Sequence, residues 1–205
     1  MKLYGERNPA PNPRRVRIFV AEKGIDLPEI RVELGKGEHK SPEHLKRNSL
    51  GQVPALELDD GRTLSESVSI CRYLEALHPN PPLFGRDPYE IGAVDQWIRR
   101  TEMRLMQAAA MVWIHADPRT AAIIKQNREL GEANKPIYAQ VCAFIDGELA
   151  GREFLATNDF TMADIILQTT VDFALFLDLP IPEGCANLKA WHERVSARPS
   201  AGANA

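Results

Sequence analysis

The polar residues whose spacing most clearly suggests chemistry are Ser65, Glu66 and Ser67. Ser65 is placed to cap a helix, so the amides of Glu66 and Ser67 are expected at the positive end of the helix dipole. Such an end binds carboxylates. The Glu66 carboxylate beside it can take an ammonium group, so the two features together suit the zwitterionic head group of an amino acid.

A second group of interest, Gln52-Val53-Pro54, comes shortly before these residues. Proline cannot donate to a strand ladder, so Pro54 is expected at the end of a strand. Only bonds that precede proline adopt the cis form at low cost, which makes Val53-Pro54 the candidate for a cis peptide. There the backbone can present polar groups to a ligand.

The elements that must position these residues follow from periodicity and from helix and turn signals. Alternating apolar residues predict strands, and a Ser-Pro-Glu sequence predicts the start of a helix. In order, the sequence predicts a strand at 2–4, a helix from about 16 to 24, a strand at 30–34, a helix from 41 to about 48, two strands around a hairpin at 59–61, and a helix at 66–77. This βαβαββα order is that of an α/β, thioredoxin-like domain.

The stretch from 79 to 88 is rich in proline and glycine and is the best linker in the chain. Beyond it no strand pattern remains, and apolar residues recur at helical spacing. Thr161 and Asp164 have the spacing of a capping box at a helix start. We therefore expect residues 1–78 to form the α/β domain and residues 89–205 to form an all-helical bundle.

Composition excludes several classes of protein. The chain has 205 residues, 44% of them hydrophobic and 26% charged, with a formal charge of -3. The basic pairs Arg14-Arg15 and Lys46-Arg47 are isolated and form no patch, so nucleic acid is not an expected partner. No apolar run has the length of a signal peptide or a membrane span, which predicts a cytoplasmic protein without membrane association. Three widely spaced cysteines without a CxxC predict neither a disulfide framework nor a zinc site.

Several motifs, in the right order, resemble the glutathione S-transferases. Gln52-Val53-Pro54 followed by Ser65-Glu66-Ser67 is similar to the glutathione-binding signature of this family. Thr161-Met162-Ala163-Asp164 resembles the capping box of the family's buried helix, and 191–194 followed by 198–200 resembles its closing helix. An α/β domain joined by a linker to a helical domain is also the family's architecture.

Residues 34–43 and 53–61 resemble, more closely still, the atypical fungal and bacterial branch that lacks the usual catalytic side chain. The resemblance implies glutathione as the co-substrate, no metal, and a homodimer. It also implies an electrophile pocket formed by the helical domain.

The resemblance further assigns glutathione-binding roles to five residues. Glu66 and Ser67 would hold the γ-glutamyl end, and the Val53 backbone would pair with the cysteinyl part. Gln52 and Lys40 would contact the glycyl carboxylate. His39 or Lys36 could take the place of Lys40, and the other alternative is that all three belong to a solvated, charged loop.

Transfer of glutathione requires the thiolate, because a thiol is a poor nucleophile. The loop between Gly5 and Pro13 contains no Ser, Thr, Cys or Tyr, and Ala10 occupies the position that resembles the family's catalytic Ser or Cys. Asn12 has an amide that can donate to the sulfur, so it ranks first as sulfur ligand; the alternative is a plain turn residue. Tyr4 lies inside a strand and is expected to be a packing residue.

The resemblance implies that a water held by the long helix of the helical domain activates the thiol in the atypical branch. His115 is then the nearest candidate; the alternative is a surface residue at a helix end. Met111 lies one turn before His115 and offers no hydroxyl to share that water. Met106, Met111 and Trp113 are candidates to line the electrophile pocket, with core packing as the alternative.

The sequence therefore predicts an enzyme that transfers the glutathione thiolate to small apolar electrophiles, a detoxification reaction. One alternative is a glutathione-dependent disulfide or peroxide reductase, in which two glutathione molecules carry out the redox chemistry. Another is a non-catalytic member of the family that binds a ligand or a protein.

Overall fold

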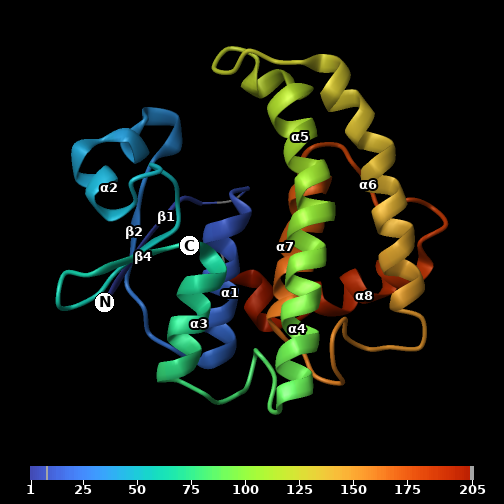
Figure 1. The fold of residues 1–205 in the computed structure, drawn as a ribbon, viewed down its shortest axis with the longest axis horizontal. Helices are drawn as coiled ribbons and strands as arrows, with labels where there is room; N and C mark the ends of the chain where they lie inside the picture. The colour runs from blue at the N-terminus through green and yellow to red at the C-terminus, as the bar shows by residue number, and fades with distance from the viewer. Residues whose placement is uncertain (8, 204–205) are drawn as a thin grey trace. The chain divides into compact units, whose positions relative to one another are not determined.

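The computed structural model describes residues 1–7 and 9–203 (Figure 1). The chain divides into two compact units. The first unit contains residues 1–83 together with the segment from Arg198 onward, and the second unit contains Phe84–Ala197. The predicted fold class is confirmed: a mixed α/β first part is followed by an all-helical part.

The first unit is built on a four-stranded mixed sheet in the order β2-β1-β3-β4. Its strands are β1 (Lys2–Gly5), β2 (Glu29–Arg31), β3 (Ala55–Glu57) and β4 (Thr63–Ser65). β1 and β2 are parallel, whereas β3 is antiparallel to both β1 and β4. Leu3 and Leu56 pair across β1 and β3 and are almost fully buried on one face of the sheet, whereas Ala55 packs with Tyr4 and Val32 on the other face.

Three helices accompany this sheet: α1 (Pro11–Lys23), α2 (Pro42–Arg47) and α3 (Ser67–Leu77). α1 and α3 pack against each other beside the sheet (Figure 1). As predicted, Gly24 ends α1, with φ at 64°. The helix begins earlier than the apolar pattern suggests, at Pro11, because a proline in the first turn loses no intrahelical hydrogen bond.

The segment from Arg198 onward packs on α1 within the first unit. Arg198 donates to both carboxylate oxygens of Glu22, with Nε–Oε1 and Nη2–Oε2 distances of 2.8 and 2.9 Å. Ser200 also donates to the Glu22 carboxylate. The short 3-10 turn Pro199–Gly202 follows this contact.

All regular secondary structure of the second unit is helical. Its helices are α4 (Pro88–Arg100), a π-helical segment η3 (Thr101–Met106), α5 (Gln107–His115), a 3-10 turn η4 (Pro118–Thr120), α6 (Arg128–Glu148), α7 (Met162–Phe176) and α8 (Ala186–Ser196). α7 lies in the core, and the predicted capping box of Thr161 and Asp164 begins it. The buried Asp164 also accepts a bond from Trp191 Nε1 at 3.0 Å, which joins α7 to α8. Among the described residues, no helix is both long and apolar enough to cross a membrane.

Candidate functional site

The strand pair β3–β4 brings the two predicted binding motifs together. Ala55 pairs with Ser65 at one end of the antiparallel ladder. Val53-Pro54 therefore precedes the ladder, and Glu66-Ser67 follows it, at the same end of the sheet. The Val53-Pro54 peptide is cis, as predicted. In the part of the chain that is described, no residue forms a hydrogen bond with the Val53 backbone.

Glu66 occupies an unusual backbone position at the start of α3. Its φ and ψ are 67° and 117°, and its side chain is exposed and forms no capping bond with the described residues. A positive φ raises the conformational free energy of a residue that has a Cβ by about 1 to 2 kcal/mol. Such strain at an exposed acidic residue is typical of a functional site. The prediction that Ser65 caps this helix is wrong, because Ser65 is the last residue of β4 and Glu66 is the N-cap.

Ser67 is the first residue of α3 and is 5% exposed. Its Oγ accepts a hydrogen bond from Arg15 Nη1 across 3.4 Å. The first intrahelical bond joins Ile70 N to Glu66 O at 2.9 Å, so the amides of 67–69 have no intrahelical acceptor. These amides and the helix dipole make this terminus suitable for a carboxylate.

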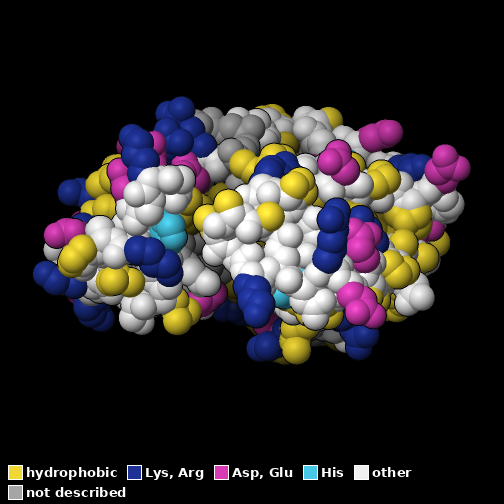
Figure 2. Space-filling model, turned by 90° about the horizontal axis from the view of Figure 1, so that it is seen from above, with side chains coloured by type: hydrophobic (Ala, Val, Ile, Leu, Met, Phe, Trp, Pro, Cys, Tyr) yellow, Lys and Arg dark blue, Asp and Glu magenta, His cyan; other side chains and the backbone are white. Residues whose placement is uncertain are grey.

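Lys40 lies against the turn that leads to Gln52 and Val53. Lys40 Nζ donates to Leu50 O at 3.0 Å. A Cβ on Gly51 would lie only 2.9 Å from Lys40 Nζ, which places the ammonium group directly over this turn. The neighbouring His39 has a lowered pKa because burial, and then the charge of Lys40, disfavour its protonation. Figure 2 shows Lys and Arg side chains near a histidine on the left-hand lobe, which is the first unit.

Asn12 lies in the first turn of α1 rather than in the preceding loop. Pro11 and Pro13 flank it and have no N–H, so among residues 11–13 only Asn12 has amide donors. Ala10 is the N-cap and forms no side-chain bond with the described residues, as expected for a methyl group. The assignment of Asn12 as sulfur ligand stays a prediction.

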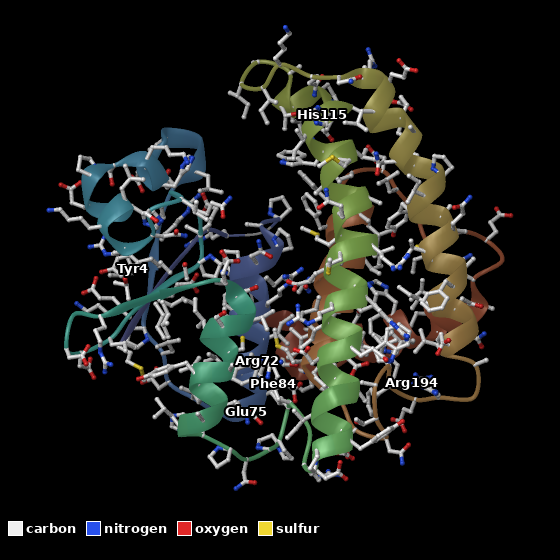
Figure 3. The ribbon with its side chains drawn as sticks, viewed as in Figure 1. Tyr4, Arg72, Glu75, Phe84, His115 and Arg194 are labelled. Atoms are coloured by element: carbon white, nitrogen blue, oxygen red, sulfur yellow. The ribbon has the colours of Figure 1, made fainter. Side chains whose placement is uncertain are left out.

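Tyr4 is a packing residue, as expected. It is 7% exposed in β1, and the Arg47 guanidinium covers its ring with the Cζ 4.0 Å from the ring centroid. Burial raises the pKa of its hydroxyl. Figure 3 shows Tyr4 over the sheet of the first unit.

His115 is the last residue of α5 in the second unit (Figure 3). Its Nδ1 lies 3.2 Å from Asn127 N and accepts the backbone N–H. The neutral ring therefore carries its proton on Nε2. Gly131 of α6 approaches so closely that a Cβ there would lie 2.8 Å from the carbonyl carbon of His115. The position of His115 in the second unit is thus fixed by the start of α6.

The three predicted pocket residues have different surroundings within the second unit. Trp113 packs against Phe173 and Phe176 of α7, with ring centroids 6.0 and 6.2 Å apart. Met106 ends η3 and Met111 lies in α5, and both are half-buried. Trp113 therefore contributes to helix packing, and contact of these residues with an electrophile stays a prediction.

The sequence interpretation missed two buried polar residues near the ladder end. Arg15 belongs to an isolated basic pair of the sequence, yet it is 2% exposed. Its spacing from Phe19, one turn later on the buried face of α1, is the signal that points to its burial. His44 is also 2% exposed and contacts the turn before Val53. Nothing in its local sequence distinguishes it from a surface histidine.

Comparison with known proteins identifies the family. Models of the glutathione S-transferase N-terminal and C-terminal domains match residues 10–77 and 102–199. Glutathione S-transferase 2 of Saccharomyces cerevisiae is 37% identical over 194 residues, which cover 93% of this chain and 83% of that protein. The chain belongs to the glutathione S-transferase family. Glutathione S-transferase F12 of Arabidopsis thaliana is 31% identical, covering 98% of this chain and 94% of that protein.

Solved structures of glutathione S-transferases agree with this assignment. Gtt2 from Saccharomyces cerevisiae superposes with a TM-score of 0.90 and 36% identity, covering 98% of both chains. A glutathione S-transferase domain-containing protein from Marinobacter aquaeolei has a TM-score of 0.90 and 35% identity, covering 98% of this chain and 99% of that one. The predicted family and its fungal and bacterial branch are confirmed. This glutathione S-transferase is therefore an enzyme, and glutathione is the substrate of its family.

Proposed function

We propose that this glutathione S-transferase joins the glutathione thiolate to small apolar electrophiles. The observation that carries the proposal is the convergence of Val53, Glu66 and Ser67 at one end of the β3–β4 ladder. Together they offer a backbone N–H, a carboxylate and a helix N-terminus. These are the groups that a γ-glutamyl head and a peptide backbone require.

Each part of glutathione has a proposed partner. The amides at the start of α3 and the Ser67 hydroxyl bind the α-carboxylate, and Glu66 binds the ammonium group. The Val53 backbone pairs with the cysteinyl part. Gln52 and Lys40 bind the glycyl carboxylate, and the position of Lys40 Nζ over the turn before Gln52 supports this assignment.

The thiol must also be ionised. Roughly 3% of a thiol with an ordinary pKa near 8.5 is thiolate at pH 7. We propose that the Asn12 amide and the start of α1 lower this pKa, because both stabilise a negative sulfur. We propose that His115 also helps to ionise the thiol; the resemblance and the proton on its Nε2 support this role.

The remaining assignments are also proposals. Residues 1–78 form the glutathione-binding domain, 79–88 the linker, and 89–205 the domain with the electrophile pocket. Met106, Met111 and Trp113 contact the electrophile. The enzyme acts in detoxification as a cytoplasmic homodimer.

A second candidate function is glutathione-dependent reduction of disulfides or peroxides. All three cysteines are buried. Burial raises the pKa of the Cys71 thiol, and it raises the pKa of the Cys142 thiol to about 12. A protein thiolate is therefore not available. Any reductase activity would need two glutathione molecules instead.

Activity assays distinguish these functions. Conjugation is measured with 1-chloro-2,4-dinitrobenzene, reduction with hydroxyethyl disulfide, and binding by titration with glutathione. The proposal predicts conjugation as the faster reaction. Reduction without conjugation would favour the second candidate, and binding without turnover would favour a non-catalytic role.

A further inference from the structure

The carbonyl of Gln52 accepts two hydrogen bonds from side chains of the first unit. His44 Nε2 lies 2.8 Å from this oxygen, and Asn48 Nδ2 lies 3.0 Å from it. His44 is 2% exposed and Asn48 is 6% exposed. Two buried donors on one carbonyl fix the orientation of the Gln52–Val53 peptide.

Both donors are held by the short helix α2 and the turn after it. The N-cap Ser41 accepts a bond from His44 N at 3.2 Å, which places His44 in the first turn. Asn48 is the C-cap, and its Oδ1 accepts from Leu50 N at 3.1 Å. Gly51 N donates to Asn48 O at 2.8 Å and closes the turn. His44 and Asn48 are therefore part of one rigid arrangement that ends at Gln52.

The geometry of a peptide bond links this arrangement to the proposed site. The Gln52–Val53 peptide is not among the cis bonds, and the C=O and N–H of a trans peptide point in opposite directions. Because the Gln52 C=O points toward His44 and Asn48, the Val53 N–H points away from them. No described residue accepts this N–H.

We infer that His44 is a positioning residue that directs the Val53 N–H toward the cysteinyl carbonyl of glutathione, with Asn48 as the second donor. The inference rests on the proposed function, since it assigns a purpose to the Val53 N–H. As a donor at Nε2, the neutral His44 ring has its acceptor at Nδ1, which forms no bond with the described residues. Of the two neutral tautomers of the ring, only the one with its proton on Nε2 can donate to this carbonyl.

The test compares two substitutions of His44. His44→Leu removes the donor, whereas His44→Gln keeps an N–H close to the position of Nε2. We expect His44→Leu to raise the Kd and KM for glutathione roughly tenfold, because a loosened peptide weakens one hydrogen bond to the ligand. The kcat at saturating glutathione should change little, and His44→Gln should recover most of the affinity. His78→Leu, an equivalent change at an exposed residue of the first unit, is the matched control.

A second variant keeps the inference testable if His44→Leu does not fold. Asn48→Asp preserves the acceptor for Leu50 N but replaces the donor with an oxygen that repels the Gln52 carbonyl. It should raise the KM for glutathione, and the NMR shift of the Val53 amide on glutathione addition should become smaller. Unchanged affinity for glutathione in the folded variants, or a fall in kcat at constant KM, would overturn the inference about His44 and leave the proposed function intact. A wild-type protein that fails to bind glutathione would instead refute the proposed function.

Discussion

Arg15 donates a hydrogen bond to the Ser67 hydroxyl, with Nη1 and Oγ 3.4 Å apart in the buried part of the first unit. The bond connects the beginning of α1 to the beginning of α3. Because the Ser67 oxygen accepts from Arg15, its own hydrogen can donate to a ligand. The same contact brings a guanidinium charge close to the proposed carboxylate site.

Ser67→Ala should weaken glutathione binding. The variant removes a donor to the α-carboxylate, which costs about 1.5 to 3 kcal/mol when the partner is charged. Titration calorimetry measures the resulting change in Kd. Ser69→Ala is the matched control, since Ser69 lies in the same helix with an exposed side chain. Equal affinities of the two variants would show that Ser67 does not bind the ligand.

Substitutions of Glu66 should separate binding from stability. Glu66→Gln keeps the size and removes the charge, so glutathione affinity should fall by on the order of 2 kcal/mol. Glu66→Gly should weaken binding as well, yet it should raise the free energy of unfolding by about 1 kcal/mol, because glycine accepts positive φ without strain. Thermal unfolding and titration measure the two effects. Retained affinity in Glu66→Gln would exclude an ammonium contact.

Asn12→Ala should raise the pKa of the bound glutathione thiol, because the side-chain donor to the sulfur is lost. The thiolate absorbs in the ultraviolet, so its absorbance against pH gives this pKa directly. Conjugation near neutral pH should slow in proportion to the lost thiolate. A titration curve identical to that of the wild type would remove Asn12 from the mechanism.

The contact of Glu22 with Arg198 predicts a pH-dependent stability. Burial opposes ionisation of Glu22, but hydrogen bonds from Arg198 and Ser200 outweigh it and lower the pKa of this carboxyl. A lowered folded-state pKa stabilises the protein above the unfolded pKa of about 4.3, and this stabilisation is lost as pH falls through the folded-state pKa.

Glu22→Gln should therefore lower the free energy of unfolding at pH 7 by about 1 to 3 kcal/mol. The difference in the free energy of unfolding between this variant and the wild type should shrink as the pH falls below about 4.3. Denaturant unfolding across this pH range measures it. Glu43→Gln, at an exposed residue in the first turn of α2, is the control. A difference that does not depend on pH would contradict the ion-pair explanation.

The parts of the fold that local signals determine could be predicted from the sequence. Gly24 ends α1 because glycine accepts positive φ, and Thr161 with Asp164 begins α7 through a capping box. The Val53-Pro54 peptide was predicted to be cis for an equally local reason. The order of strands and helices then predicted the fold, and residues 52–54 and 65–67 carried the resemblance to a glutathione-binding motif.

The features that were missed depend on contacts between segments far apart in sequence. Arg15 is buried because α3 packs against α1, and its partner Ser67 lies 52 residues away. Glu66 rather than Ser65 is the N-cap of α3, because Ser65 pairs with Ala55 and is still part of β4. His44 is buried because the turn before Val53 folds back over α2. Periodicity does not contain information of this kind.

Calorimetry with glutathione and the wild-type protein tests the central claim most directly. The account predicts measurable heat of binding and a rise in Tm, since glutathione at 100 times its Kd stabilises the folded state by about 2.7 kcal/mol. Absence of both heat and a Tm shift at millimolar glutathione would contradict the claim that the end of the β3–β4 ladder binds this tripeptide.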